Sequence, residues 1–215
     1  NRKPEKDFIW KGFKELKKVW IELKGYPTLR NFLIAFFLLS VGVQTIILLA
    51  TIFGSSELGL GTTNLIVTVL LIQFVAILGA WVFSNVSKKL GNFMAIKITI
   101  FIWILVCFSA FMLEKELKNV EIYFYALGGL LGLVLGAIQS LSRSTYSKLI
   151  PDSTHDHATY FSFYDVTEKL GMVLGVFLFG LVENLTGDIK QSVLALITFF
   201  VLAIIILKTV PKEEK

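Results

Sequence analysis

The sequence has 215 residues, of which 55% are hydrophobic and only 17% are charged, with a formal net charge of +5. Soluble domains carry about 25% charged residues, so this composition excludes an ordinary soluble domain and indicates a multi-pass protein of the lipid bilayer. Because the basic residues are spread over several loops, the charge does not predict a nucleic-acid partner.

The first segment, residues 1–29, is basic and periodic. Between residues 5 and 24 the lysines lie mostly opposite a set of apolar residues that recur at steps of three and four: Ile9, Phe13, Leu16, Trp20 and Leu23. This pattern predicts an amphipathic cytoplasmic helix that lies on the membrane surface or packs on the underside of the protein. A calmodulin-like partner would suit the same pattern.

Apolar runs long enough to cross a bilayer follow near residues 30–53, 64–83, 94–113, 122–142, 158–183 and 190–207. The loops between them are short, so we expect one six-helix bundle over residues 30–208 and a cytoplasmic tail over residues 209–215. The fold class is therefore an all-α membrane protein. The first residue is Asn instead of Met, which we interpret as the start of a fragment or of one half of a larger protein.

Lysine and arginine set the expected orientation, because basic residues stay on the cytoplasmic side. Eighteen of the 21 fall in the termini and in the regions after the second and fourth runs, which predicts cytoplasmic termini. Six crossings then divide into two triplets of opposite orientation, the 3+3 inverted repeat of secondary transporters. No residue-level identity between the triplets is evident to support this symmetry.

Uncharged polar residues fall near mid-membrane on the first two runs. Gln44 and Thr45 lie on the first and Gln73 on the second. An amide there can hydrogen-bond a substrate or bridge two helices, so these residues and Gln139 are candidates for lining a substrate path. Cys107, the one cysteine, lies in the third run and is interpreted as a packing residue.

Small residues four apart follow the fourth run as Gly128, Gly132 and Gly136, and the fifth as Gly171 and Gly175. Such faces let helix backbones approach closely. They predict either static helix packing or smooth contacts that let helices slide during transport, and the sequence leaves both open.

Four charged residues are expected near the cytoplasmic ends of the fourth and fifth runs: Arg143, Asp165, Glu168 and Lys169. A charge at the centre of a membrane helix costs about 2.5–3.5 kcal/mol on insertion scales, so these residues should be paired or face water. Asp165 and Lys169 are spaced for an ion pair, and Arg143 can reach Asp165 or Glu168. We expect an inner gate, with a static cluster and a proton-coupling carboxylate as alternatives.

The connection after the fourth run contains Asp152, His155, Asp156 and His157. Two histidines two residues apart without a supporting pair do not predict a metal, and a solvated loop is the better interpretation. The sequence has no HExxH, no GxSxG and no phosphate-binding glycine loop, so we expect neither an enzyme nor a cofactor.

Longer motifs resemble a branch of the major facilitator superfamily that includes the vacuolar amino-acid effluxers related to autophagy. They are Gly136–Ser144 (GAIQSLSRS), Lys148–Pro151, Tyr160–Tyr164 (YFSFY) and Glu168–Gly171, with Gly42–Thr45 and Gln73–Ala76 on the first two runs. The resemblance extends from about residue 6 to the end of the chain.

The resemblance implies the C-terminal six-helix half of a twelve-helix transporter that works by alternating access. Residues 5–24 would link the halves, a small solute would bind between this bundle and the missing N-terminal half, and a proton or sodium gradient would supply energy. The family's charge relay is not implied, because Lys88 stands where its loop motif has an acid. The alternative is a non-catalytic six-helix protein that forms a homodimeric pore or scaffold.

Overall fold

The computed structural model describes residues 14, 17–151, 154 and 156–210. Over these residues the fold is all-helical and contains no strand, which confirms the predicted class. A short 3-10 helix, η1 (Leu23–Gly25), precedes the long helices, which are α2 (Pro27–Ser56), α3 (Thr62–Leu90), α4 (Asn92–Met112), α5 (Val120–Leu149), α6 (His157–Thr186) and α7 (Ile189–Thr209).

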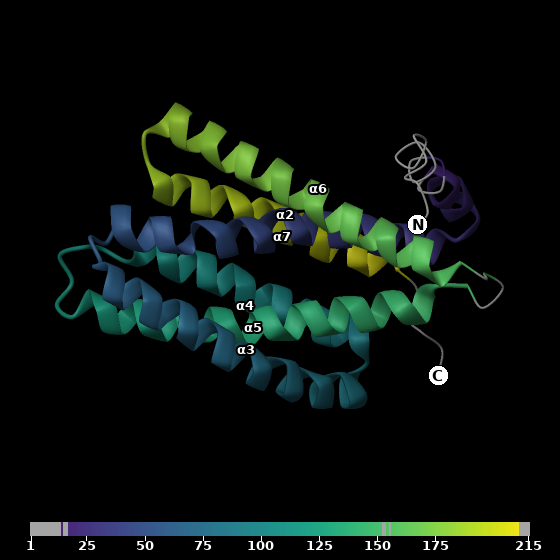
Figure 1. The fold of residues 1–215 in the computed structure, drawn as a ribbon, viewed down its shortest axis with the longest axis horizontal. Coiled ribbons are helices and arrows are strands. Elements are labelled where there is room, and N and C mark those ends of the chain that lie inside the picture. Colours follow the sequence, from purple (N-terminus) through teal and green to yellow (C-terminus); the bar gives the residue numbers. More distant parts are fainter. Residues whose placement is uncertain (1–13, 15–16, 152–153, 155, 211–215) are drawn as a thin grey trace, which may run out of the picture.

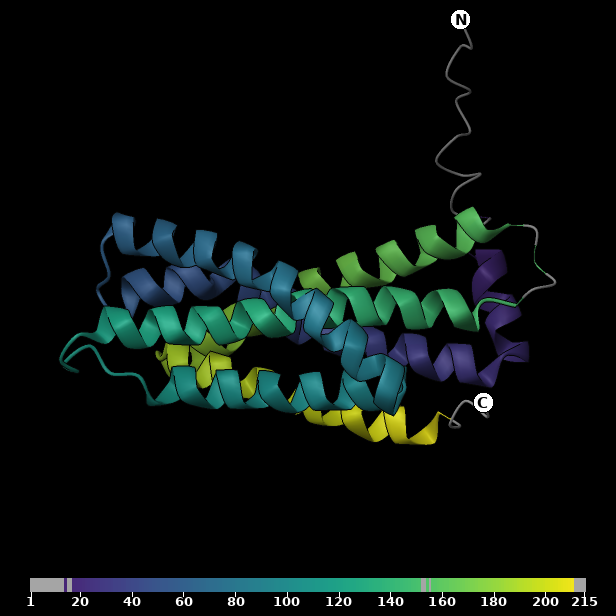
Figure 2. The same cartoon turned by 90° about the horizontal axis from the view of Figure 1, so that it is seen from below.

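The long helices run lengthwise through the molecule (Figures 1 and 2). The start of α2, the α3–α4 turn, the α5–α6 loop and the end of α7 lie toward one end, which we call the η1 end, and the other three connections lie toward the opposite end (Figure 1). Consecutive long helices therefore cross the molecule in alternating directions.

Five of the described helices are long and apolar enough to cross a membrane: α2, α3, α4, α5 and α7. The chain is thus an integral, multi-pass membrane protein. The sixth long helix, α6, is not among the five, although an apolar crossing was predicted over residues 158–183. Asp165, Glu168 and Lys169 lie in its first half. These charges lower the mean hydropathy of any membrane-length segment of α6 that contains them.

Two predicted spans end later than their apolar runs. Helix α3 continues through the basic residues to Leu90, and only Gly91, with φ of 84°, separates it from α4. Helix α5 continues seven residues beyond residue 142 to Leu149. The Thr145 hydroxyl in this polar end is satisfied within the helix, where it donates to the Leu141 carbonyl at 2.6 Å. Arg143 consequently lies inside the helix and not at its end.

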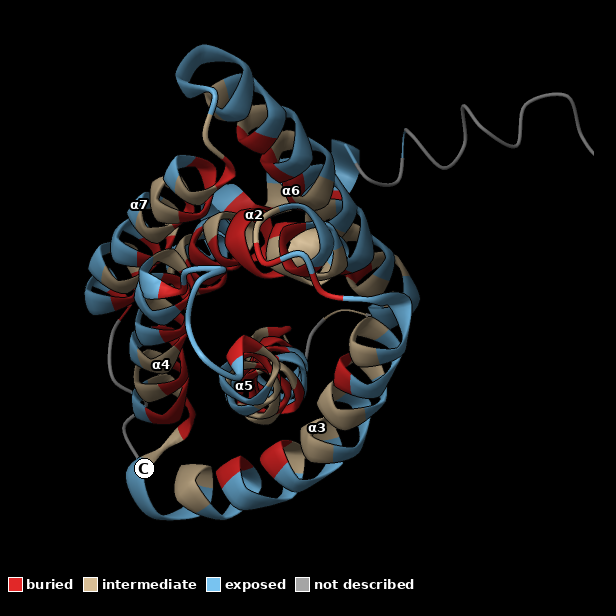
Figure 3. Cartoon of the chain, turned by 90° about the vertical axis from the view of Figure 1, so that its left-hand side faces the viewer, coloured by how far each residue is buried: buried red, intermediate tan, exposed pale blue. Residues whose placement is uncertain are grey.

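Glycines determine which helices pack most closely, namely α5 on α3 and α6 on α2. A Cβ atom on Gly132 or Gly136 of α5 would collide with the backbone of α3 at Ile72 or Ala76. A Cβ atom on Gly175 of α6 would likewise collide with the backbone of α2. In end view α5 lies among α2, α3 and α4 (Figure 3). The predicted small-residue faces are therefore sites of close backbone contact.

The segment before η1 is helical over residues 17–22 and packs against α6. Val19 and Leu23 are buried, and the Tyr160 hydroxyl donates to Glu22 at 2.9 Å. Trp20, which the periodicity placed on the apolar face, is 58% exposed. This part thus packs on the protein itself, one of the two predicted arrangements, while residues 1–13 lie outside the described part of the chain.

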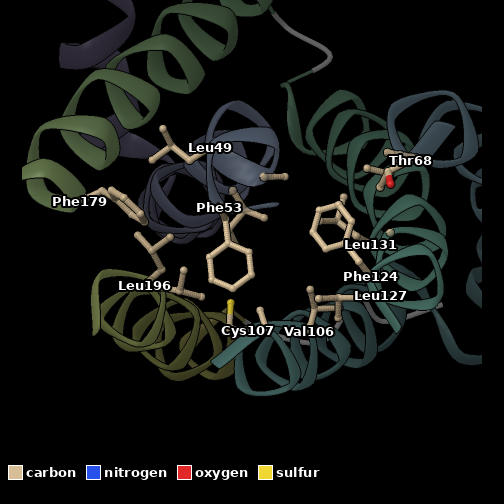
Figure 4. A pocket seen from close by; sticks show the side chains of 16 residues that line it. Leu49, Phe53, Thr68, Val106, Cys107, Phe124, Leu127, Leu131, Phe179 and Leu196 are labelled. Carbon is tan, nitrogen blue, oxygen red and sulfur yellow. The ribbon is translucent and has the colours of Figure 1, made fainter. Parts of the chain in front are cut away.

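A small apolar pocket of about 50 Å³ lies in the half of the bundle away from the η1 end. Phe53, Cys107, Phe124 and Leu196 are among the side chains around it (Figure 4). The hydroxyl of Thr68, the one side-chain oxygen in its lining, donates to the Asn64 carbonyl at 2.8 Å. With its polar atom already satisfied, the pocket is a packing gap with nothing to orient a polar ligand.

Candidate functional site

A larger hollow of about 360 Å³ lies between α2, α5 and α6, in the half of the bundle nearer the η1 end. Unlike the apolar pocket, it is lined by polar side chains from all three helices. We call it the polar cavity, and its polar residues are Ser40, Gln44, Gln139, Ser142, Arg143 and Glu168. Four of these, Gln44, Gln139, Arg143 and Glu168, are candidates that the sequence predicted.

Arg143 pairs with Asp165 across α5 and α6, with Nη2 and Oδ1 2.6 Å apart. The guanidinium also stacks over two α6 rings, with its carbon 5.9 Å from the Phe161 centroid and 5.7 Å from that of Tyr164. Both charged side chains are more than half exposed, at 58% and 52%. The pair is thus an accessible contact that can open, and it is worth little as a source of stability.

Glu168 is held from the other side of the polar cavity. The Gln44 side chain donates from Nε2 to Oε1 of Glu168, which ties α2 to α6. Next to this contact, the rings of Phe36 and Tyr164 stack with centroids 4.0 Å apart. The carboxylate therefore lies between a polar partner and an aromatic wall, inside an otherwise apolar bundle.

Ser142 is the member of the polar cavity that sequence reasoning missed. It is 1% exposed, and its Oγ has no hydrogen-bond partner in the described structure. Its neighbours on α5 differ, because Ser140 and Thr145 donate to carbonyls of the preceding turn. A buried hydroxyl without a partner costs free energy, so a bound polar group is the natural complement. Its place three residues after Gln139 was the available signal.

The remaining predicted residues lie elsewhere. Thr45 is fully buried and donates to the Val41 carbonyl at 2.6 Å, so it lies in the α2–α6 contact and outside the polar cavity. Gln73 is exposed on α3 and lines a separate, mainly apolar hollow of about 230 Å³. Lys169 is exposed, and among the described residues Asp165 pairs with Arg143 and not with Lys169.

The α5–α6 connection is built as a helix cap. Asp156 accepts hydrogen bonds from the backbone N–H and the hydroxyl of Thr159. These bonds, with a smaller contribution from Lys18, hold the pKa of the Asp156 carboxyl below its ordinary value. The described residues contain no cluster of three His, Cys, Asp or Glu side chains that could hold a metal, and Asp152 and His155 lie outside them.

The polar cavity thus offers both signs of charge, two amides and several hydroxyls, among them that of Ser142, to a ligand. Arg143 and Gln139 can donate to an anionic or carbonyl group, while Glu168 can accept from a cationic or hydroxyl group. Such an arrangement suits a small polar solute, and polar groups inside a membrane bundle mark solute or ion pathways.

The whole chain, residues 1–215, matches the family described as vacuole effluxer Atg22 like. The chain belongs to this family. The resemblance predicted from the motif around Gln139 and Arg143 is therefore confirmed.

Curated relatives of the chain include an uncharacterized MFS-type transporter, YxiO, of Bacillus subtilis, which is 32% identical over 98% of this chain and 47% of its own length. Autophagy-related protein 22 of Vanderwaltozyma polyspora is 33% identical over 94% of this chain and 41% of its own length. The chain therefore spans less than half the length of these curated relatives.

Proposed function

We propose that this chain is the C-terminal six-helix half of a secondary active transporter that moves a small polar solute by alternating access. The relatives' names, an MFS-type transporter and an autophagy-related protein, support this function. The observation that carries the proposal is the polar cavity. Its charged and amide groups lie inside a bundle with five helices apolar enough to span a membrane. Burying such groups there costs free energy, so their presence points to a functional site.

The proposed topology puts both termini in the cytoplasm and adds α6 as the sixth crossing. Helices α2–α4 and α5–α7 then form the 3+3 inverted repeat, and residues 1–29, 30–208 and 209–215 serve as linker, bundle and tail. The pattern of contacts supports the repeat, because α2–α6 packing has its counterpart in α5–α3 packing, and α2–α7 packing in α5–α4 packing. The exposed polar side chains at the edge of the polar cavity would face the N-terminal half.

We further propose that the Arg143–Asp165 pair is the inner gate, with Glu168 the carboxylate that couples transport to a proton or sodium ion. The pair is exposed enough to open, and Phe161 and Tyr164 give Arg143 further contacts on α6 that do not depend on the Asp165 carboxylate. Lys169, one turn beyond Asp165, would be the partner that receives its carboxylate in the open state.

The test is uptake by the full-length protein that contains this chain, reconstituted in sealed vesicles. The twenty common amino acids are tested first, with an imposed proton or sodium gradient. We expect gradient-dependent accumulation of at least one solute, and loss of the pH dependence in the Glu168→Gln variant. Asp165→Asn should slow uptake and keep the pH dependence, because it affects the gate and not the coupling carboxylate.

Two results would contradict the proposal. Equal, gradient-independent leakage of unrelated solutes would favour the homodimeric pore. Uptake unchanged in rate and pH dependence in the Asp165→Asn/Glu168→Gln double variant would remove both roles from the charge cluster.

A further inference from the structure

When the proposed repeat is used to pair the helices, the two triplets share a short residue pattern at the polar cavity, which was not evident from the sequence alone. Helix α2 carries Gly42-Val43-Gln44-Thr45, and 95 residues later α5 carries Ala137-Ile138-Gln139-Ser140. At each of the four positions the residue types agree: small, β-branched, glutamine and hydroxyl. Both glutamines line the polar cavity.

The same offset of 95 residues relates α3 to α6. It pairs Gln73 with Glu168, and each of these lies 11 residues after the first residue of its helix, Thr62 or His157. It also pairs Ala76 with Gly171, two small residues at helix crossings. Three positions of functional interest thus recur at one offset on helices that the proposed repeat makes equivalent.

Backbone contacts follow the same relation. A Cβ atom on Gly136 would meet the backbone of Ala76, where α5 crosses α3. A Cβ atom on Gly171 would lie 3.1 Å from the backbone nitrogen of Val41, where α6 crosses α2. Gly136 is the counterpart of Val41, and Ala76 that of Gly171, so the two crossings are equivalent.

Equivalent crossings give the two polar pairs the same axial relation. Glu168 is three residues before Gly171, and Gln44 is three residues after Val41. Gln73 and Gln139 have these same spacings from Ala76 and Gly136. Because the Gln44 and Glu168 side chains bridge this separation, Gln139 and Gln73 can bridge the corresponding one on α5 and α3.

Only one of the two pairs is formed in this structure. Gln44 donates to Glu168, whereas Gln139 lines the polar cavity and Gln73 lines a different hollow. No hydrogen bond joins Gln73 to Gln139 in the part of the chain described here. In a transporter built from inverted repeats, the two repeats adopt different conformations in each transport state. One formed pair and one open pair are the difference expected between the repeats in one such state.

We propose that Gln73 and Gln139 form a second polar latch, the symmetry counterpart of Gln44 and Glu168. The Gln73–Gln139 bond forms when the Gln44–Glu168 bond opens, so each latch stabilises one of two states. The amide–carboxylate bond is charge-assisted and the amide–amide bond is neutral, which biases the molecule toward the state observed here. This inference rests on the proposed function, since it presumes two transport states.

The experiment measures the balance between the states by sided thiol labelling of the full-length protein, with Cys107→Ala and its other cysteines replaced. Ser144→Cys reports on the groove beside the polar cavity, and Thr51→Cys reports on the hollow that Gln73 lines. A membrane-impermeant maleimide is applied to right-side-out and inside-out vesicles. Each reporter is combined with Gln44→Leu, with Gln139→Leu and with both.

We expect Gln44→Leu to raise Ser144→Cys labelling and lower Thr51→Cys labelling. The ratio of the two rates should change about tenfold, which is the effect of one net hydrogen bond to a charged group on a two-state equilibrium. Gln139→Leu should shift both labelling rates in the opposite direction. The double variant should return toward the parent, because both latches are lost. Gln191 is the fourth glutamine of the chain and is exposed, outside both proposed latches. Gln191→Leu is therefore the matched control and should shift neither labelling rate.

Shifts in the same direction, or no shift with Gln139→Leu, would overturn the second latch. That result is separable from failure of the proposed function, because solute uptake is measured on the same vesicles. Uptake with no opposing shifts refutes the latch alone. Opposing shifts without uptake of any amino acid support the latch and move the search to other solutes.

Discussion

The polar cavity and the apolar pocket share helices α2, α5 and α6, yet these helices give the two sites different chemistry. Helix α2 contributes Ser40 and Gln44 to the first and Leu49 and Phe53 to the second. Helix α5 contributes Gln139 and Arg143 to the first and Phe124 and Leu131 to the second. The character of these helices therefore changes along their length, and not only around their circumference.

This difference separates two roles within one bundle. The half around Phe53 and Phe124 encloses the apolar pocket, where the one side-chain oxygen of the lining is already satisfied. The half around Arg143 and Glu168 keeps groups that are unpaired or can be unpaired. Substitutions in the first half should change stability without changing transport, and substitutions in the second should do the reverse.

The largest expected effect is at Arg143. Arg143→Ala removes the cation of the polar cavity and leaves Asp165 without its partner, so solute uptake should fall at least about tenfold. Thermal stability in detergent should change by no more than about 1 kcal/mol, because the ion pair is more than half exposed. Arg143→Lys should restore part of the uptake, since it keeps the charge and loses the planar group. A loss of uptake that tracks a large loss of stability would assign Arg143 to the core.

The boundary between the two halves is tested at Gly136. Its Cβ position coincides with the backbone of Ala76, so Gly136→Ala forces α5 away from α3 and should destabilise the protein by about 1–3 kcal/mol. Gly180→Ala is the matched control, because no atom lies near its Cβ position, and a helical alanine there should stabilise by about 0.5–1 kcal/mol. Melting temperatures in detergent measure both. Equal effects of the two substitutions would deny the close crossing.

Ser142 separates stability from transport most sharply. Ser142→Ala removes a buried hydroxyl without a partner, so the protein should be as stable as before or more stable by about 1 kcal/mol. Uptake should nevertheless fall severalfold, because the free hydroxyl is a proposed solute contact. Ser192→Ala, an equally buried serine that donates to the Phe179 carbonyl at 3.0 Å, should lose about 0.5–1.5 kcal/mol and keep its uptake. If Ser142→Ala instead lowered stability and left uptake unchanged, Ser142 would have a structural role and would not contact the solute.

The smallest effect is expected at Cys107 in the apolar pocket. Cys107→Ala deletes one buried sulfur and should lower stability by about 1 kcal/mol or less, since the site is apolar and the change is small. Uptake should remain that of the parent protein. A variant with normal stability and impaired uptake would show that the apolar pocket takes part in transport.

Much of the fold follows from the sequence, because apolar runs longer than a bilayer's thickness have few alternatives to helices. The helix ends do not follow as readily. The sequence from Ser142 to Leu149 contains little that is apolar, so hydropathy ended the fourth run too early. Packing of buried side chains such as Tyr146 keeps α5 helical to Leu149. Similarly, Lys88 and Lys89 suggested a loop, but the conformation at Gly91 alone makes the α3–α4 turn.

The sequence predicted most of the residues of the site, but it did not predict which of them contact one another. Arg143, Glu168, Gln44 and Gln139 stand out as polar residues in apolar surroundings, and the fold brings them to one cavity. The sequence could not distinguish Gln44 from Thr45, because only the rotation of α2 decides which side chain faces α5. It also could not identify Ser142 among several nearby hydroxyls, since that depends on which of them find a partner.

The central claim is that the polar cavity lies on a water-accessible solute path and that the apolar pocket does not. The most direct measurement labels Gln139→Cys and the native Cys107 in the same full-length protein with a membrane-impermeant thiol reagent. We predict rapid reaction at residue 139 from one side of the membrane, slowed by a transported solute, and no reaction at Cys107. Equal reactivity at the two sites, or none at residue 139 from either side, would contradict the account.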